Sequence, residues 1–305
     1  MNKKGSAIII VLMLVIISVA VSIFFISVSK KMIKSSNLLL DKLYAQVGVE
    51  SELEIIKFYI STGERKFDFV KNVSIRNILP SRIYVDGREQ IIDNNTKIRV
   101  VDTGTKFNLW MCDLNYLKSL LILKGIKRDN VEVIMESIKD WYDKDSIPNP
   151  AGAENFFYKR KNLKYVPRNS KAIQSVFELG LIKGLRNNNE AFHILKKYSV
   201  VSPDWHFNIN TMDACMLSSV FGISCEISKV LVKRRKKENY LFPEDIEKYM
   251  PKNRKVFDPF IYLYFPTCVF NIDVVYKYGE AKSEKSCLID FCGKKDVAFR
   301  VLECE

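Results

Sequence analysis

The chain has 305 residues, of which 48% are hydrophobic, and carries a formal net charge of +13. Such a charge is compatible with nucleic acid or anionic lipid as a partner, but the lysines and arginines are scattered. Lys233–Lys237 is a pure basic run, which we interpret as a solvated helix face. With two histidines, His193 and His206, and no CxxC pair, the sequence argues against a zinc site.

The first predicted element is a long helix that begins in a membrane. Ala7–Ser29 contains 23 residues without a charge. At a rise of about 1.5 Å per residue this segment is about 34 Å long, enough to cross a bilayer core of about 30 Å. The helical pattern continues to Thr62, so we predict one helix over residues 6–62 that ends at Gly63.

Beyond the membrane the predicted helix has two apolar faces. One face carries Val49, Leu53, Ile56 and Ile60, and a nearly opposite face carries Leu40, Leu43 and Val47. Two apolar faces indicate two partners, which are the protein's own core and neighbouring helices.

A very short basic leader, Met1–Gly5, precedes the apolar segment. It is compatible with an ordinary uncleaved signal anchor, or with a prepilin-like leader that is cut after Gly5 so that Ser6 becomes the amino terminus. The lysines that flank the apolar segment do not settle its orientation, because two precede it and three follow it closely.

The remaining chain alternates between β-type and helical composition. Short β-type runs occupy residues 66–73, 82–85, 89–92 and 97–101, with Asp86-Gly87 as a predicted hairpin turn. Residues 107–249 have a helical pattern, and residues 256–302 return to β-type runs with turns at Gly279 and Gly293. We therefore predict an α+β fold whose β region, residues 63–106 and 250–305, is interrupted by a helical domain over residues 107–249.

A repeat lies inside the predicted helical domain. Phe107–Leu109, followed by a helix, a glycine turn and a second helix, recurs about 100 residues later at Phe207–Ile209, and residues 177–198 form a weaker third copy. The units resemble helix-hairpin-helix motifs. Because the turns at Gly125 and Gly222 have one glycine each, we favour a packing scaffold over a DNA-binding role.

The densest polar segment lies between the copies. Its four carboxylates are Asp140, Asp143, Asp145 and Glu154, on a helix end and the Pro/Gly-rich loop that follows. Clustered carboxylates on an irregular loop suit Ca²⁺, which takes 6 to 8 oxygen ligands. The alternative is that Lys139 and Lys144 neutralise these groups and the loop binds no metal.

Seven cysteines allow disulfides if the body lies outside the cytoplasm. Four of them, Cys268, Cys287, Cys292 and Cys304, crowd the last 40 residues, while Cys215 and Cys225 are ten residues apart. An odd count leaves at least one thiol free, and the pairing stays open.

Several motifs occur in a fixed order along the chain. They are Lys3-Lys4-Gly5, Asp140-Trp141-Tyr142-Asp143-Lys144-Asp145, Gly152-Ala153-Glu154 with Tyr158, Glu178-Leu179 and Asn208-Ile209-Asn210-Thr211. Together they resemble the K-type minor pseudopilins of bacterial type II secretion, general secretion pathway protein K. The resemblance covers nearly the whole chain. It departs at Trp110, where the family usually has a second asparagine.

This resemblance implies a pilin-like fold, with a long amino-terminal helix on an antiparallel sheet and a large inserted helical domain that binds calcium. It implies a single-pass protein of the inner membrane with its body in the periplasm. Prepilin peptidase would remove the leader and the new terminus would be methylated. The implied partners are the I-type and J-type minor pseudopilins, the major pseudopilin and the inner-membrane secretion platform.

The resemblance also bears on position in the filament. Most subunits of such filaments carry an acidic residue five positions into the mature chain, where it is thought to neutralise the amino terminus of the subunit above. Here that position is Ile10, which predicts a place at the tip and a role in initiating assembly.

No GxSxG, HExxH or P-loop motif indicates an enzyme. Two alternatives to the pseudopilin are a membrane-anchored helix-hairpin-helix DNA-binding protein and a minor pilin of a type IV pilus, and we expect no nucleic-acid partner.

Overall fold

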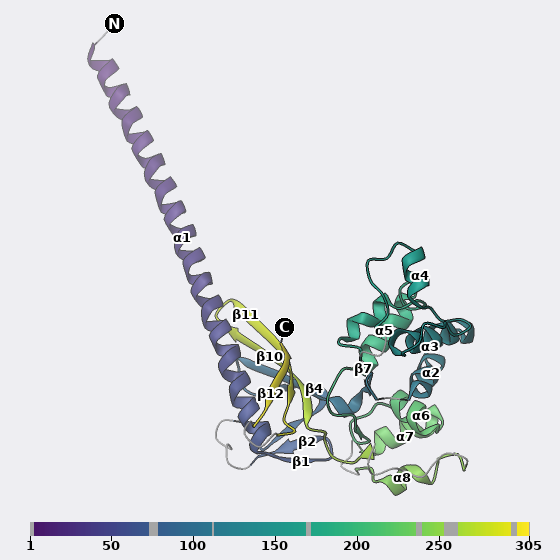
Figure 1. Ribbon diagram of the computed structural model, residues 1–305. Helices are drawn as coiled ribbons and strands as arrows, with labels where there is room; N and C mark the ends of the chain where they lie inside the picture. The colour runs from purple at the N-terminus through teal and green to yellow at the C-terminus, as the bar shows by residue number, and fades with distance from the viewer. Residues whose placement is uncertain are drawn as a thin grey trace.

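The computed structural model describes residues 3–72, 79–111, 113–168, 172–235, 240–252, 262–293 and 298–304. The chain forms a long helix, an antiparallel sheet packed on the second half of that helix, and a helical lobe beside the sheet (Figure 1). The fold is therefore mixed, with a long amino-terminal helix, as the sequence predicts.

The amino-terminal helix α1 runs without a break from Lys3 to Thr62. It is long and apolar enough to cross a membrane, and its most apolar segment is 0% buried inside the protein. Figure 1 shows that α1 projects far beyond the sheet before it reaches the body. The predicted faces differ in burial: Val49, Leu53, Ile56 and Ile60 are buried, whereas Leu40, Leu43 and Val47 are at least half exposed.

The main sheet packs on the buried face of α1. Its strands are β4 (Asp86–Ile91), β5 (Thr96–Asp102), β10 (Val269–Tyr278), β11 (Ala281–Asp290) and β12 (Arg300–Cys304), in the order β12-β11-β10-β5-β4, all antiparallel. Side chains alternate across a strand, so that Val100, Ile272 and Ile289 pack with α1 in one core while their neighbours point to the opposite face.

A smaller sheet of β1 (Glu64–Lys66), β2 (Phe69–Lys71) and β3 (Arg82–Tyr84) follows α1. The prediction of a single strand over residues 66–73 is wrong, because Phe67 takes a left-handed conformation with φ 49 and the chain reverses there. The predicted hairpin turn at Asp86-Gly87 is also wrong. Both residues belong to β4, whose pairing with β5 shifts register between Asp86 and Glu89, as in a β-bulge.

The helical lobe has its own hydrophobic core, built from residues 107–246 with Tyr262 packed against it. Its elements are α2 (Leu114–Leu123), α3 (Arg128–Tyr142), α4 (Asn155–Arg160), α5 (Asn189–Tyr198), α6 (Ala214–Phe221), α7 (Cys225–Arg235) and α8 (Pro243–Glu247), with short 3₁₀ helices η1 (Thr103–Thr105) and η2 (Val176–Leu181). The third repeat copy differs from the other two, since its first half is the 3₁₀ helix η2.

Two short parallel strand pairs tie the lobe together. β6 (Phe107–Asn108) pairs with β7 (Ser199–Val200), and β8 (Phe207–Asn208) pairs with β9 (Tyr262–Leu263). β9 therefore lies with the helical lobe although residues 250–305 were predicted as β region. The start of the predicted run at Val256 lies outside the described residues. Domain limits at 106/107 and 249/250 stay a prediction.

Two disulfides, Cys268–Cys292 and Cys287–Cys304, resolve the pairing among the last four cysteines. Cys287 and Cys304 are opposite one another on β11 and β12, so this bond holds the edge strand to the sheet. Cys215 and Cys225 are free. Cys112 lies outside the described residues.

Candidate functional site

The acidic loop brings three of its four predicted carboxylates together. Asp140 lies in the last turn of α3, Asp143 follows at the C-cap, and Glu154 is the N-cap of α4. One oxygen from each of the three lies within 4.8 Å of the others. Asp145 is exposed, accepts a hydrogen bond from the backbone N–H of Ile147, and is not part of this group.

Several oxygens of the group are buried and receive no hydrogen bond from the residues that the structure describes. They are Oδ1 of Asp143 and both carboxylate oxygens of Glu154. Burial raises the pKa of Asp143 and of Glu154, and the charges of neighbouring aspartates raise both further. Buried polar atoms are nearly always paired, and a hard cation is a partner that such oxygens accept. The residues present therefore fit a calcium ion.

The loop is held in place by contacts that sequence motifs did not reveal. Asn149 donates through its backbone N–H and side-chain amide to Asp140, and Ala151 N–H donates to Glu136. Lys183 Nζ donates to the carbonyls of Ala151 and Gly152 at 3.0 and 2.8 Å. Glu136 lies four residues before Asp140 on the same face of the helix, so its place near the loop could have been inferred from the sequence. No sequence pattern indicated Lys183.

Gly152 is required by the close approach of Asp140. A Cβ added at Gly152 would lie 2.0 Å from Asp140 Oδ2. The glycine thus lets the returning loop lie directly over the carboxylate, which explains why Gly-Ala-Glu accompanies the aspartates in this sequence.

A second polar cluster joins the helical lobe to the sheet. The carboxylate of Asp102, at the end of β5, accepts hydrogen bonds from Gly104 N–H (2.9 Å), from the Asn208 side-chain amide (2.8 Å), and from both the N–H and hydroxyl of Thr267 (3.2 and 2.5 Å). Asp102 is fully buried. Burial raises its pKa to about 6, although the hydrogen bonds from Thr267, Asn208 and Gly104 oppose this rise.

Comparisons with known proteins find similarity over part of the chain. Residues 108–204, which include the acidic loop, match the family model for type II secretion system (T2SS) protein K. The chain is 34% identical over 133 residues to "Putative type II secretion system protein K" of Escherichia coli strain K12 (40% of this chain, 39% of the relative). It is 28% identical over 192 residues to type II secretion system protein K of Pectobacterium carotovorum (57% and 58%) and 24% over 164 residues to that of Pseudomonas aeruginosa (50% and 48%).

The chain is thus similar to the type II secretion system protein K family over residues 108–204. It spans less than two thirds of the length of these relatives. Its fold is similar to a chain in the crystal structure of the GspK-GspI-GspJ complex from the type 2 secretion system of enterotoxigenic Escherichia coli. That match has a TM-score of 0.58 at 16% identity and covers 89% of this chain and 98% of that one.

The protein K motif Asn208-Ile209-Asn210-Thr211 has a structural role here. Asn208 donates to Asp102 and to the carbonyl of Phe67, and so connects the lobe to the sheet region. The Asn210 side chain donates to the carbonyls of Leu241 and Tyr264 and accepts from Leu241 N–H. Both asparagines therefore hold backbone segments that are far apart in sequence.

The first repeat copy uses its single asparagine in a comparable way. The Asn108 amide donates to the carbonyls of Ser202 and Asp204, and its oxygen accepts from Trp110 N–H. Trp110, which corresponds to Asn210 of the second copy, donates its indole N–H to the carbonyl of Ile173 at 2.6 Å. Both side chains thus donate to backbone carbonyls, but of different segments.

The Glu178-Leu179 motif pairs with Arg168. Two guanidinium nitrogens of Arg168 donate to the two Glu178 oxygens, and Gln174 N–H donates to the same carboxylate. Burial opposes ionisation of Glu178, but these hydrogen bonds outweigh it and lower its pKa. This ion pair joins Arg168 to η2.

The predicted leader and tip residues Gly5, Ser6 and Ile10 all lie within α1. α1 begins at Lys3, before the predicted cleavage position.

Proposed function

We propose that this protein is a minor pseudopilin of the type II secretion system that caps the pseudopilus tip and takes part in initiating its assembly. The observation that carries the proposal is a combination of two features. The 60-residue α1 packs on a sheet at its carboxyl-terminal end, and residues 108–204 of the helical lobe match the protein K family. The role is one of assembly rather than catalysis.

The exposed side of α1 supports packing with other filament subunits. Leu40, Leu43, Tyr44 and Val47 are each at least half exposed on the part of α1 that leaves the membrane segment. Exposed apolar patches of this kind mark contact surfaces. By analogy with the GspK-GspI-GspJ complex, the proposed neighbours are the I-type and J-type minor pseudopilins, with the major pseudopilin below and the inner-membrane platform at the base.

The proposed location is the inner membrane, crossed once by α1, with the body in the periplasm. The two disulfides in the body support this side of the membrane, because disulfides persist in oxidising compartments.

The two helical hairpins act as packing elements in this proposal. α2 and α3 are joined at Gly125 with φ 89, and α6 and α7 at Gly222 with φ 69. Both pairs contribute buried leucines, Leu120 and Leu217 among them, to the core of the lobe. The alternative is that the pairs are helix-hairpin-helix motifs that bind DNA, and steeply salt-dependent DNA binding by the protein would favour that alternative.

We expect prepilin peptidase to remove the leader between Gly5 and Ser6. In cells with an active peptidase, mass spectrometry of the membrane-extracted protein should find an amino terminus at Ser6 that carries a methyl group. Gly5→Val should leave Met1 in place, while Ser22→Ala, a substitution inside the membrane segment, should be processed normally. An intact Met1 terminus in the wild-type protein would contradict the prediction.

We expect the protein at one end of the filament at few copies. A subunit with Ile10 cannot neutralise the buried amino terminus of a subunit above it, and an unpaired charge in an apolar environment costs several kcal/mol. Gold labelling of sheared pseudopili should therefore mark a single end. Ile10→Glu should allow incorporation along the shaft, with Ile16→Glu as the matched control that should not. Even labelling of wild-type shafts would refute the tip position.

We propose that Asp140, Asp143 and Glu154 hold a calcium ion, which would neutralise three convergent carboxylates and fix the loop between α3 and α4. The support is the group of buried oxygens without donors together with the close fit of Gly152. Asp145, the fourth predicted ligand, is exposed outside the group and in this proposal only adds negative charge nearby.

A further inference from the structure

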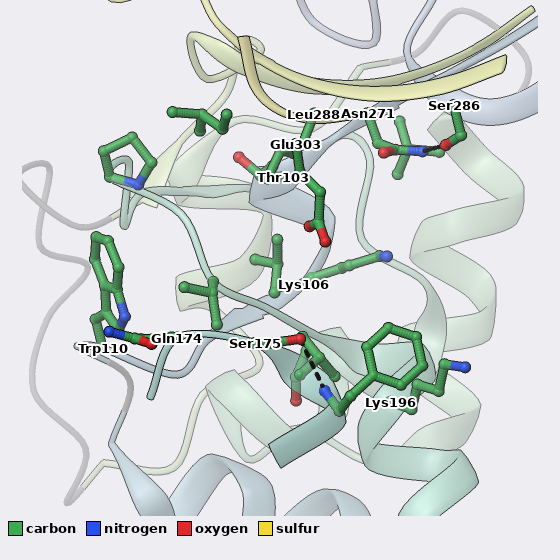
Figure 2. Close-up of a pocket in the computed structure, with 18 of the residues that line it drawn as sticks. Thr103, Lys106, Trp110, Gln174, Ser175, Lys196, Asn271, Ser286, Leu288 and Glu303 are labelled. Atoms are coloured by element: carbon green, nitrogen blue, oxygen red, sulfur yellow. Dashed lines mark hydrogen bonds between the residues drawn. The ribbon is translucent and has the colours of Figure 1, made fainter. Parts of the chain in front are cut away.

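A cleft of about 710 Å³ lies between the sheet and the helical lobe. One wall is the face of the main sheet that points away from α1, and the other wall consists of η2 with the segment before it, and of residues 199–203 (Figure 2). A volume of this size accommodates a few residues of a ligand chain.

The sheet wall is polar where the strands lie side by side. Asn271, Leu288 and Glu303 are cross-strand neighbours on β10, β11 and β12 and share the face that lines the cleft. Ser286 lies beside them and donates to Asp273 at 2.6 Å. This wall therefore offers hydrogen-bonding side chains to a ligand in the cleft.

The charges around the cleft are predominantly positive. Lys106, Lys196 and Arg300 line it, and Glu303 is the one carboxylate among the described lining residues. Arg300 is paired with Asp290, and the Lys196 ammonium lies over the ring of Phe177 at 4.2 Å. These two cations thus have local partners.

Lys106 differs from the other two. Its side chain is partly buried and crosses the middle of the cleft, with Glu303 and Asn271 above it and Ser175 below (Figure 2). Its ammonium group makes no hydrogen bond or ion pair with any residue in the described part of the chain. Burial lowers its pKa, although the charge of Asp273 opposes this. A carboxylate brought to this ammonium would replace water with a charge-assisted hydrogen bond.

Apolar side chains line the cleft alongside these charges. Trp110 and Phe177 are about half exposed, and the apolar lining also includes Val176, Val201 and Leu288. A polypeptide in extended conformation points alternate side chains to opposite sides, so it can present carboxylates toward Lys106 while its other side chains contact these apolar groups. A nucleic acid is less suited, because the sheet wall carries Glu303.

We propose that this cleft binds an extended, acidic segment of a partner protein, with one of its carboxylates held by Lys106. The proposal is independent of the calcium site and of leader processing. It assigns an interaction surface to the space between the lobe and the sheet, whereas the tip position concerns the contacts of α1.

The test uses the full-length protein in a non-ionic detergent and a short fluorescein-labelled peptide of alternating valine and aspartate. We expect saturable binding by fluorescence anisotropy, and weaker binding by about tenfold or more for the peptide with asparagine in place of aspartate. Lys106→Gln should weaken binding of the acidic peptide about tenfold, and Lys196→Gln to a smaller extent. Lys161→Gln, which removes an exposed charge on the far end of α4, should change it less than about twofold.

Thermal unfolding of each variant separates a lost contact from a lost fold. If Lys106→Gln lowers the melting temperature, the peptide affinity of the wild type is compared instead with that of Lys196→Gln, a substitution at an exposed position. Equal binding of the aspartate and asparagine peptides, or equal affinity for Lys106→Gln and Lys161→Gln, would overturn the proposal. So would displacement of the peptide by succinate or by single-stranded DNA at equal concentration, because either result would assign the cleft to a different ligand.

Discussion

The melting temperature of the helical lobe is expected to rise by about 5–10 °C when the protein is transferred from chelator to calcium at roughly a hundred times its dissociation constant. At that ratio, a ligand that binds only the folded state contributes about 2.7 kcal/mol, and 1 kcal/mol corresponds to roughly 2–4 °C for a unit of this size. The source of the gain is relief of repulsion among Asp140, Asp143 and Glu154, whose oxygens converge within 4.8 Å. Differential scanning calorimetry in the two buffers measures it.

Variants distinguish this site from general effects of calcium. Asp143→Asn and Glu154→Gln should each abolish the shift, because each removes a carboxylate from the group. Asp145→Asn is the matched control, since it removes a neighbouring charge outside the group and should leave most of the shift. Identical melting curves in calcium and in chelator would end the proposal, and loss of the shift in Asp145→Asn alone would mean that the ligand set is wrong.

Asp102→Ala is expected to lower the free energy of unfolding by about 3–5 kcal/mol at pH 4.5. The substitution leaves the buried N–H groups of Gly104 and Thr267 and the amide of Asn208 without their acceptor, and each unpaired buried group costs roughly 1–3 kcal/mol. Urea denaturation followed by tryptophan fluorescence gives the difference. Asp129→Ala, at an exposed position in the first turn of α3, should cost less than about 1 kcal/mol.

The difference in the free energy of unfolding between the wild type and Asp102→Ala should become smaller as the pH rises. The folded-state pKa of Asp102 is raised from 3.8 to about 6, so the folded state binds the proton more tightly than the unfolded state. Its stabilising contribution is therefore fully present below about pH 4 and is lost as the pH rises through about 6, a total of about 3 kcal/mol. The wild type loses this contribution at pH 7.5 and the alanine variant has none to lose. A deficit that grew from pH 4.5 to pH 7.5 would contradict the assignment.

The long helix shows what a period in the sequence can determine. The spacing of Val49, Leu53 and Ile56 was sufficient to predict the helix and an apolar face, because one face of an amphipathic helix must be covered. The structure shows that the sheet covers this face and leaves the second apolar face exposed. The β region was less predictable. Phe67 splits one expected strand into two, and a non-glycine residue in the left-handed region has no signature in local composition.

The acidic loop likewise shows that local sequence does not determine the geometry of a site. Composition placed four carboxylates in one segment, but the direction of each side chain depends on contacts made elsewhere. Lys183 and Asn149 fix the returning loop so that Glu154 meets Asp140 and Asp143, while Asp145 turns outward to its own backbone. Spacing along an irregular loop carries no periodic information, so it could not exclude Asp145.

The sequence by itself determined the long amino-terminal helix with its apolar segment, the interruption of a β-rich region by a helical block and the order of the motifs, because each depends on local composition or on a fixed order along the chain. Only the tertiary structure decided that Lys106, in the cleft, makes no ion pair with any residue of the described part of the chain. It also decided which cysteines pair, which carboxylates converge, and how Asp102 and Asn208 join the lobe to the sheet. These are contacts between residues up to 165 positions apart, as for Asp102 and Thr267, and their geometry is set by the packing of two cores against one another.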